Sequence, residues 1–148
     1  MCSKKFIFAF ILFVPLLLFA QNNKILIEAS FTDQNKLLID QEIIFYNVAD
    51  VSLDTIYLLN WANSYKDKYT PLSKRLIEDY DKSLHFAKLK DRGYSKILLL
   101  QHKDQNIGFE EPAKASDIVR VLLPETLVAG DSIKLHVVYE VKIPNDKF

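Results

Sequence analysis

The chain has 148 residues, with 19 basic and 19 acidic side chains, so its formal net charge at pH 7 is zero. This balance, without a long run of either charge, leaves no electrostatic footprint for nucleic acid or for an anionic membrane surface. The single cysteine, Cys2, lies at the N-terminus. Because we expect it to be removed with an export signal, no thiol remains for a disulfide, a metal or a nucleophile.

Residues 1–20 have the pattern of a signal peptide. Lys4 and Lys5 form a positive start, and residues 6–20 are an uncharged apolar run that is shorter than the roughly twenty residues of a membrane-spanning helix. We predict cleavage after Ala20 and a periplasmic or extracellular location. The alternative is an uncleaved N-terminal anchor, since Leu18 is larger than the residue usual at that distance from a cleavage site. Only in that case would a membrane be a partner.

Residues 21–148 predict a single domain. This length is sufficient for one hydrophobic core, and the sequence shows no internal repeat, low-complexity tract or dividing linker. We expect a mostly β fold, a saddle-like antiparallel sheet or a β-sandwich, with one inserted α-helix over about residues 71–84.

The first three expected strands precede this helix. Residues 24–32 and 36–47 alternate between apolar and polar side chains around the polar turn Asp33-Gln34-Asn35, which predicts a β-hairpin with one buried face. Residues 55–60 are a short apolar run, which favours a third strand buried on both faces. We expect Trp61 to anchor the end of this strand in the core.

The helix prediction rests on its start signal and its apolar stripe. Thr70 suits the N-cap and Pro71 the first helical position. The stripe consists of Leu72, Leu76, Ile77, Tyr80 and Leu84, and Arg75 and Asp79 are spaced for an ion pair on the opposite face.

Four further β segments are expected after an exit loop at Gly93. They cover residues 96–102, 107–110, 117–123 and 133–143. Gly130 is expected to adopt a positive φ in the turn before the last strand. That strand alternates over its whole length, with Ile133, Leu135, Val137, Tyr139, Val141 and Ile143 on one face.

The histidines do not form a recognisable metal motif. A helical zinc-peptidase site needs two His separated by three residues with a Glu directly after the first, and His85, His102 and His136 are each followed by another residue type. Their ordinary interpretations are a helix end, a strand end and an exposed strand face. A metal site assembled from all three is the less favoured alternative.

Other candidate chemistry is equally weak. Ser95 lacks the glycine pattern of a nucleophile elbow and is interpreted as a turn residue, while Glu110 and Glu111 are adjacent and favour a solvated loop. Most aromatic side chains, Tyr57 and Tyr80 included, are assigned to the core, which leaves Tyr65 and Tyr69 as candidate contact residues. We therefore predict no catalytic, cofactor-binding or metal-binding residue in this chain.

Several segments together resemble a known family. They are Leu59-Asn60-Trp61-Ala62-Asn63-Ser64-Tyr65, Thr70-Pro71-Leu72-Ser73-Lys74-Arg75, Lys90-Asp91-Arg92-Gly93, and the strand-turn-strand that begins Leu122-Leu123-Pro124-Glu125-Thr126-Leu127. The combination, which spans residues 24–148, is similar to the N-terminal β domain of bacterial M1-like zinc metallopeptidases of the aminopeptidase N group.

The resemblance implies a non-catalytic role. In that family the N-terminal domain is a curved antiparallel sheet that packs on the catalytic domain and shapes its cleft. The zinc, its ligands and the general-base Glu belong to the following domain, so we expect this chain to stop before them, to hold no cofactor and to be inactive alone. Its partner would be a catalytic peptidase domain, in cis or in trans. The alternative is a free-standing exported β-sandwich that binds a protein or a glycan.

Overall fold

The computed structural model describes residues 23–32 and 35–148. The predicted signal peptide, residues 1–20, lies outside the described residues. In chain order the elements are β1 (Lys24–Thr32), β2 (Lys36–Tyr46), β3 (Leu53–Leu59), the 3-10 helix η2 (Trp61–Tyr65), α2 (Pro71–Glu78), the 3-10 helix η3 (Leu89–Asp91), β4 (Tyr94–His102), β5 (Gln105–Asn106), β6 (Phe109–Glu110), β7 (Ile118–Leu127) and β8 (Ser132–Lys142).

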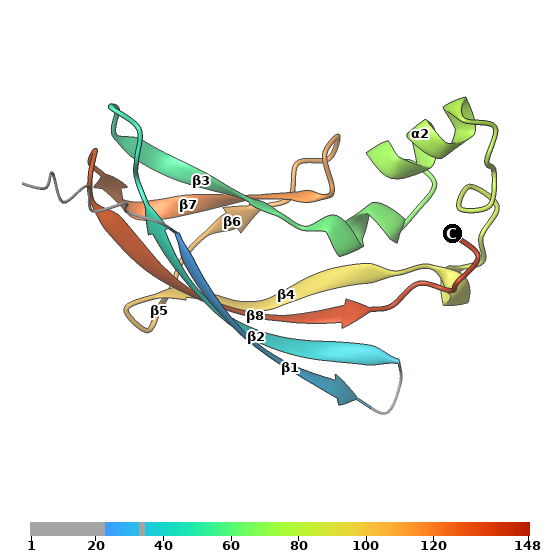
Figure 1. The fold of residues 1–148 in the computed structure, drawn as a ribbon, viewed down its shortest axis with the longest axis horizontal. Helices are drawn as coiled ribbons and strands as arrows, with labels where there is room; N and C mark the ends of the chain where they lie inside the picture. Colours follow the sequence, from blue (N-terminus) through green and yellow to red (C-terminus); the bar gives the residue numbers. More distant parts are fainter. Residues whose placement is uncertain (1–22, 33–34) are drawn as a thin grey trace, which may run out of the picture.

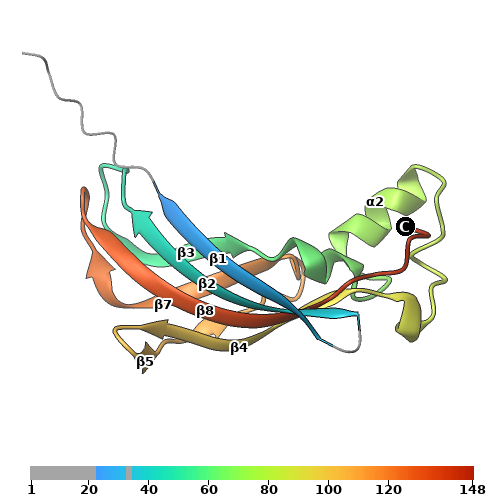
Figure 2. The same ribbon diagram turned by 60° about the horizontal axis from the view of Figure 1, so that its bottom comes forward.

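The strands form two antiparallel sheets, as the expected mostly β fold requires (Figure 1). Sheet A has the order β1-β2-β8-β4-β5, and sheet B has the order β3-β7-β6. The predicted β1–β2 pairing is confirmed, because the two strands pair without interruption from Lys24↔Ile44 to Thr32↔Lys36. The predicted buried face is wrong for β1, because all nine residues of this strand are exposed. Strand β8 lies at the centre of sheet A, between β2 and β4. Figure 2 shows that the long strands of sheet A are strongly curved.

The core lies between the two sheets. Its buried members come from both inner faces: Ile43, Leu100, Ile133, Leu135 and Val137 from sheet A, and Ile56, Val119, Val121 and Leu127 from sheet B. The predicted alternation of β8 is confirmed at Ile133, Leu135 and Val137, while His136 on the opposite face is only half-buried. Tyr139 and Val141 remain partly exposed because sheet B does not extend over that end of β8.

The α-helix is shorter than the sequence predicts. Thr70 caps it as expected, accepting a hydrogen bond from the Ser73 amide at 3.2 Å, and the Arg75–Asp79 pair forms at 3.2 Å. The helix ends at Glu78 rather than near residue 84, because Tyr80 adopts φ +63° and the Asp81 amide donates to the Leu76 carbonyl. This left-handed cap stops the helix. Leu84 is buried in the following turn, and Tyr80 is exposed.

Strand β3 also differs from its prediction. It covers residues 53–59 and is an edge strand of sheet B, and only its face with Ile56 packs into the core between the sheets. Ile56 is 4% exposed, whereas Tyr57 points outward and is not a core residue. Trp61, expected in the core, is 62% exposed at the start of η2. The apolar run misled the prediction because a strand in two packed sheets is covered by the other sheet on one face only.

Two predicted β segments, residues 107–110 and 117–123, differ in their bounds from the strands in the structure. The Ile107 amide still donates to Leu100 of sheet A, but Phe109 already pairs with Val121 of sheet B, so residues 107–110 do not form one strand. Strand β7 continues past Pro124 to Leu127. Its register with β3 is irregular at this point, because Leu53 pairs with Leu127 whereas Thr55 pairs with Leu122. A proline, which has no amide proton, fits such an interruption. Gly130 has the predicted positive φ, +83°.

Candidate functional site: an apolar groove between the sheets

An apolar groove of about 660 Å³ opens between the two sheets. It lies on the side where the edge strand of sheet A, β1, and the edge strand of sheet B, β3, leave the sandwich unclosed. Figure 1 shows β3 and β7 above one end of sheet A and the η2–α2 segment above the other. The groove follows from this arrangement, because sheet B covers only part of the inner face of sheet A.

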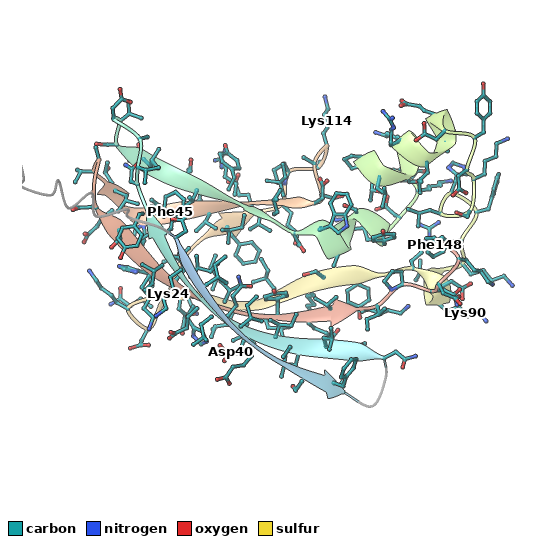
Figure 3. All side chains as sticks on the ribbon, viewed as in Figure 1. Lys24, Asp40, Phe45, Lys90, Lys114 and Phe148 are labelled. Atoms are coloured by element: carbon teal, nitrogen blue, oxygen red, sulfur yellow. The ribbon has the colours of Figure 1, made fainter. Side chains whose placement is uncertain are left out.

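The floor of the groove is the inner face of sheet A. Strand β2 places Ile39, Ile43 and Phe45 there, and Figure 3 shows Phe45 between the two sheets. Their neighbours on the floor are Ile25 from β1, Ile97 from β4, and Val137, Tyr139 and Val141 from β8. These residues share a face because side chains two apart on a strand point the same way.

The rim on the other side is built by the end of β3 and the start of η2. Tyr57, Leu59 and Trp61 line the groove and are also strongly exposed, at 62%, 87% and 62%. Leu58, Asn60, Ala62 and Val119 also line this side. Large apolar side chains are thus presented to solvent along both borders of the groove, since Ile25 of β1 is more than half exposed as well.

Polar groups in the groove are few and uncharged. The Tyr139 hydroxyl donates to Gln41 Oε1 at 2.8 Å, and burial raises the pKa of Tyr139, which keeps its hydroxyl protonated at neutral pH. Asn60 is anchored through its backbone, which donates to the Asp117 carbonyl at 2.7 Å. Among the described residues, the groove is lined by no Asp, Glu, His, Lys or Arg. The groove is therefore suited to burying apolar surface.

The motif Trp61-Ala62-Asn63 shapes one end of this groove. Asn63 is a buried residue of η2. Its Oδ1 accepts from the Ser95 amide at 3.3 Å and its Nδ2 donates to Glu111 at 3.4 Å. The asparagine thereby ties η2 to β4 and to the loop after β6. This bridge positions Trp61 at the rim, which indicates a structural reason for the motif.

The structure separates the three histidines into two locations. His102 and His136 both line a shallow hollow of about 580 Å³ on the outer face of sheet A, whereas His85 lies in the turn after α2 and does not line it. His102 Nδ1 is 2.8 Å from the Lys134 carbonyl and His136 Nε2 is 2.8 Å from Asp40. In the part of the chain that the structure describes, no three His, Cys, Asp or Glu side chains are grouped to hold a metal ion.

The remaining sequence candidates occupy ordinary positions. Ser95, expected in a turn, is instead a buried residue of β4. Glu110 forms an ion pair with Arg120 at 3.2 Å, and Glu111 lies 3.6 Å from Lys66. Tyr69 is exposed near the N-terminus of α2, outside the groove lining.

Sequence reasoning missed the residues that matter most here. Tyr57, Leu59 and Trp61 were assigned to the core because each is apolar and lies in an apolar run. The available signal was the apolar character of both faces of β3, at Tyr57 and Leu59 on one side and Ile56 and Leu58 on the other. In an edge strand, this pattern indicates a surface for contact as readily as a buried position.

Comparison of the chain with protein-family models, with curated proteins and with solved structures found no match. Among the helices of the described residues, none has the length and apolar character to cross a membrane.

Proposed function

We propose that this chain is the non-catalytic N-terminal β domain of an exported M1-like zinc metallopeptidase, and that its apolar groove packs on the catalytic domain. The observation that carries the proposal is the exposed apolar border of the groove, formed by Ile25, Tyr57, Leu59 and Trp61. Exposed apolar side chains gathered around one groove are unfavourable in water and mark a contact surface.

Two further features support this role. The groove lining is uncharged, so a partner can cover it without leaving a buried charge unpaired. The curved sheet A with its partly covered inner face also agrees with the saddle-like sheet that the resemblance implies. In this role the chain would shape the partner's cleft, while the zinc and its ligands would come from the partner.

The first test is to read the coding DNA beyond the codon for Phe148. We expect an open or interrupted frame that encodes His-Glu-x-x-His with a further Glu downstream. The encoded catalytic region is then expressed separately and mixed with this chain. Trp61 is the only tryptophan of the chain, so selective labelling of this residue makes its fluorescence a direct probe of the groove rim.

We expect a stable complex and a blue shift of Trp61 emission as the rim becomes buried. Leu59→Asp should weaken the complex at least about tenfold, since it places a charge in the apolar contact. Leu89→Asp is the matched control, because Leu89 is similarly exposed on η3 but does not line the groove. Absence of such a coding region, or equal weakening by both variants, would refute the proposal.

A second candidate function is a free-standing binding module for a glycan or a protein. It is favoured by the two exposed aromatic rings at the rim, Tyr57 and Trp61, because such rings stack on sugar faces. Titration with soluble β-1,4-glucan oligomers should then shift Trp61 emission, and Trp61→Ala should abolish binding. A response to these oligomers together with no binding to a catalytic region would favour the module.

A further inference from the structure

We propose that the free edge of β1 pairs antiparallel with β1 of a second copy of this chain, joining two A sheets into one continuous sheet. This inference goes beyond the proposed function because it concerns the strand edge, whereas the catalytic partner would cover the groove. It rests on three observations: the regularity of β1, the direction of its backbone groups and the charges on its outer face.

Strand β1 is the one long, regular edge of the described sheets. The two sheets end in β1 and β5, and in β3 and β6. Strands β5 and β6 have two residues each, and β3 is interrupted by an irregular register between Leu53 and Thr55. By contrast, β1 has nine residues in unbroken register with β2 and contains no proline. Short strands, bulges and prolines are among the devices that protect an edge from pairing, and β1 has none of these three.

The hydrogen bonds of β2 show which residues of β1 direct their backbone N–H and C=O groups to the free edge. The Tyr46 amide donates to Asn23 Oδ1, on the β1 side of β2, whereas the Asn47 amide donates to Asp131, next to β8. Because backbone groups alternate along a strand, even-numbered residues of β2 bond to β1. Pairs such as Leu26↔Glu42 therefore exchange hydrogen bonds within the chain. The odd-numbered residues of β1, Ile25 and Ile27 among them, direct their amides and carbonyls to the free edge.

The charges on the outer face of β1 select a register. Glu28 lies directly opposite Asp40 of β2, and like charges in that position are unfavourable. Within the described residues, neither Glu28 nor Lys24 has an ion-pair partner. Glu28 thus has no cation beside it among the described residues, and a neighbouring chain can supply one. Figure 3 labels Lys24 and Asp40 on the two strands.

In a dimer whose two-fold axis passes through Leu26, each copy supplies such a cation to Glu28 of the other copy. In that register Lys24 of each copy faces Glu28 of the other, and Leu26 faces Leu26 on the same side of the sheet. On the groove side, Ile25 faces Ile27, and these residues carry the free backbone groups. An axis through Glu28 would place two carboxylates together, and an axis through Ile27 would place Leu26 against Glu28. The chain is self-complementary only in the first of these registers.

The test uses the full-length gene product in its processed form and reverses one charge at a time. The wild-type chain should have the mass of a dimer by light scattering. Lys24→Glu places like charges at both contacts, and so does Glu28→Lys, so each variant should dimerise roughly tenfold more weakly. Mixing the two variants should restore a dimer with one copy of each, because the contacts become complementary again. Lys114→Glu is the matched control, since Lys114 is exposed far from β1.

Amide hydrogen exchange provides a second readout. Raising the protein concentration should protect the Ile25 and Ile27 amides, while the Leu26 amide, already bonded to β2, should change little. A monomeric wild type, a dimer unaffected by either reversal, or a mixture that fails to restore the dimer would overturn the proposal. Binding of a catalytic region to the β1 edge by a monomeric chain would also overturn it. Loss of groove binding in Leu59→Asp would not contradict the dimer proposal. The failure of one proposal can therefore be distinguished from the failure of the other.

Discussion

At the scale of single residues, the contribution of a side chain to stability depends more on its environment than on its type, as two leucines show. Leu135 is fully buried between the sheets, whereas Leu59 is 87% exposed at the groove rim. Leu135→Ala should lower the free energy of unfolding by about 2–5 kcal/mol, through lost burial and a cavity. The same truncation at Leu59 should change it by less than about 0.5 kcal/mol. Urea unfolding of both variants measures the difference, and equal losses would show that the rim is part of the core.

The ion pair on the outer face of sheet A predicts a specific acid sensitivity. Glu140 accepts hydrogen bonds from Lys36 Nζ and from the Tyr94 hydroxyl, both at 3.0 Å, and the bond from Lys36 is the main cause that lowers the pKa of Glu140 below its ordinary value of 4.5. The folded state therefore binds this proton less tightly than the unfolded state. Its stabilising contribution is complete above pH 4.5 and is lost as the pH falls through the lowered pKa.

Glu140→Gln should remove this part of the acid dependence. We expect the variant to be less stable than wild type near neutral pH and the difference to shrink below pH 4.5. Denaturant unfolding across the acid range measures it, with Glu125→Gln at an exposed position of β7 as the control. A constant difference at all pH values would exclude the ion pair as the cause.

At the scale of elements, the short helix α2 depends on its cap. The Thr70 hydroxyl donates to the Ser64 carbonyl at 2.6 Å and accepts from the Ser73 amide at 3.2 Å, so it joins α2 to η2. Thr70→Ala should cost about 1 kcal/mol, since a buried amide and a carbonyl lose their partner. Thr70→Ser keeps the hydroxyl and should recover most of this stability. Thermal unfolding compares the three proteins, and equal melting temperatures for Ala and Ser would contradict the role of the hydroxyl.

At the scale of the whole molecule, the described residues leave large apolar side chains exposed and group no three His, Cys, Asp or Glu side chains for a metal ion. We predict that the isolated chain neither retains stoichiometric zinc nor cleaves aminoacyl substrates, because no ligand pair has workable spacing. Elemental analysis and a chromogenic aminopeptidase assay measure the two properties. Stoichiometric zinc that is lost on replacing His85, His102 or His136 would contradict the prediction.

Export is the second prediction at this scale. We expect the secreted product to lack residues 1–20, because a positive start, an apolar run and Ala20-Gln21 agree with a cleavable signal. Intact-mass measurement of the exported protein decides the matter. A mass that includes the apolar run would indicate an anchor and would place the domain at the membrane surface.

The sequence by itself determined the local structure. The strict alternation of β8, the β1–β2 hairpin, the Thr70 cap and the positive φ of Gly130 were predictable, because each depends on neighbouring side chains or on backbone sterics within a few residues. The end of α2 at Glu78 was missed because its apolar stripe continued in sequence while Tyr80 adopted a left-handed conformation.

Only the tertiary structure decided which apolar faces are covered. Alternation places Ile56 and Leu59 on opposite faces of β3, but nothing local tells which of these faces is covered: Ile56 is buried under sheet A and Leu59 is exposed. The difference arises from how the strands are arranged, since sheet A packs against the face of β3 that carries Ile56, and since the strand order leaves β1 and β3 as edge strands. Strand order is set by contacts between segments far apart in sequence. For that physical reason, the groove and the free edge of β1 could not be predicted from the pattern of residues alone.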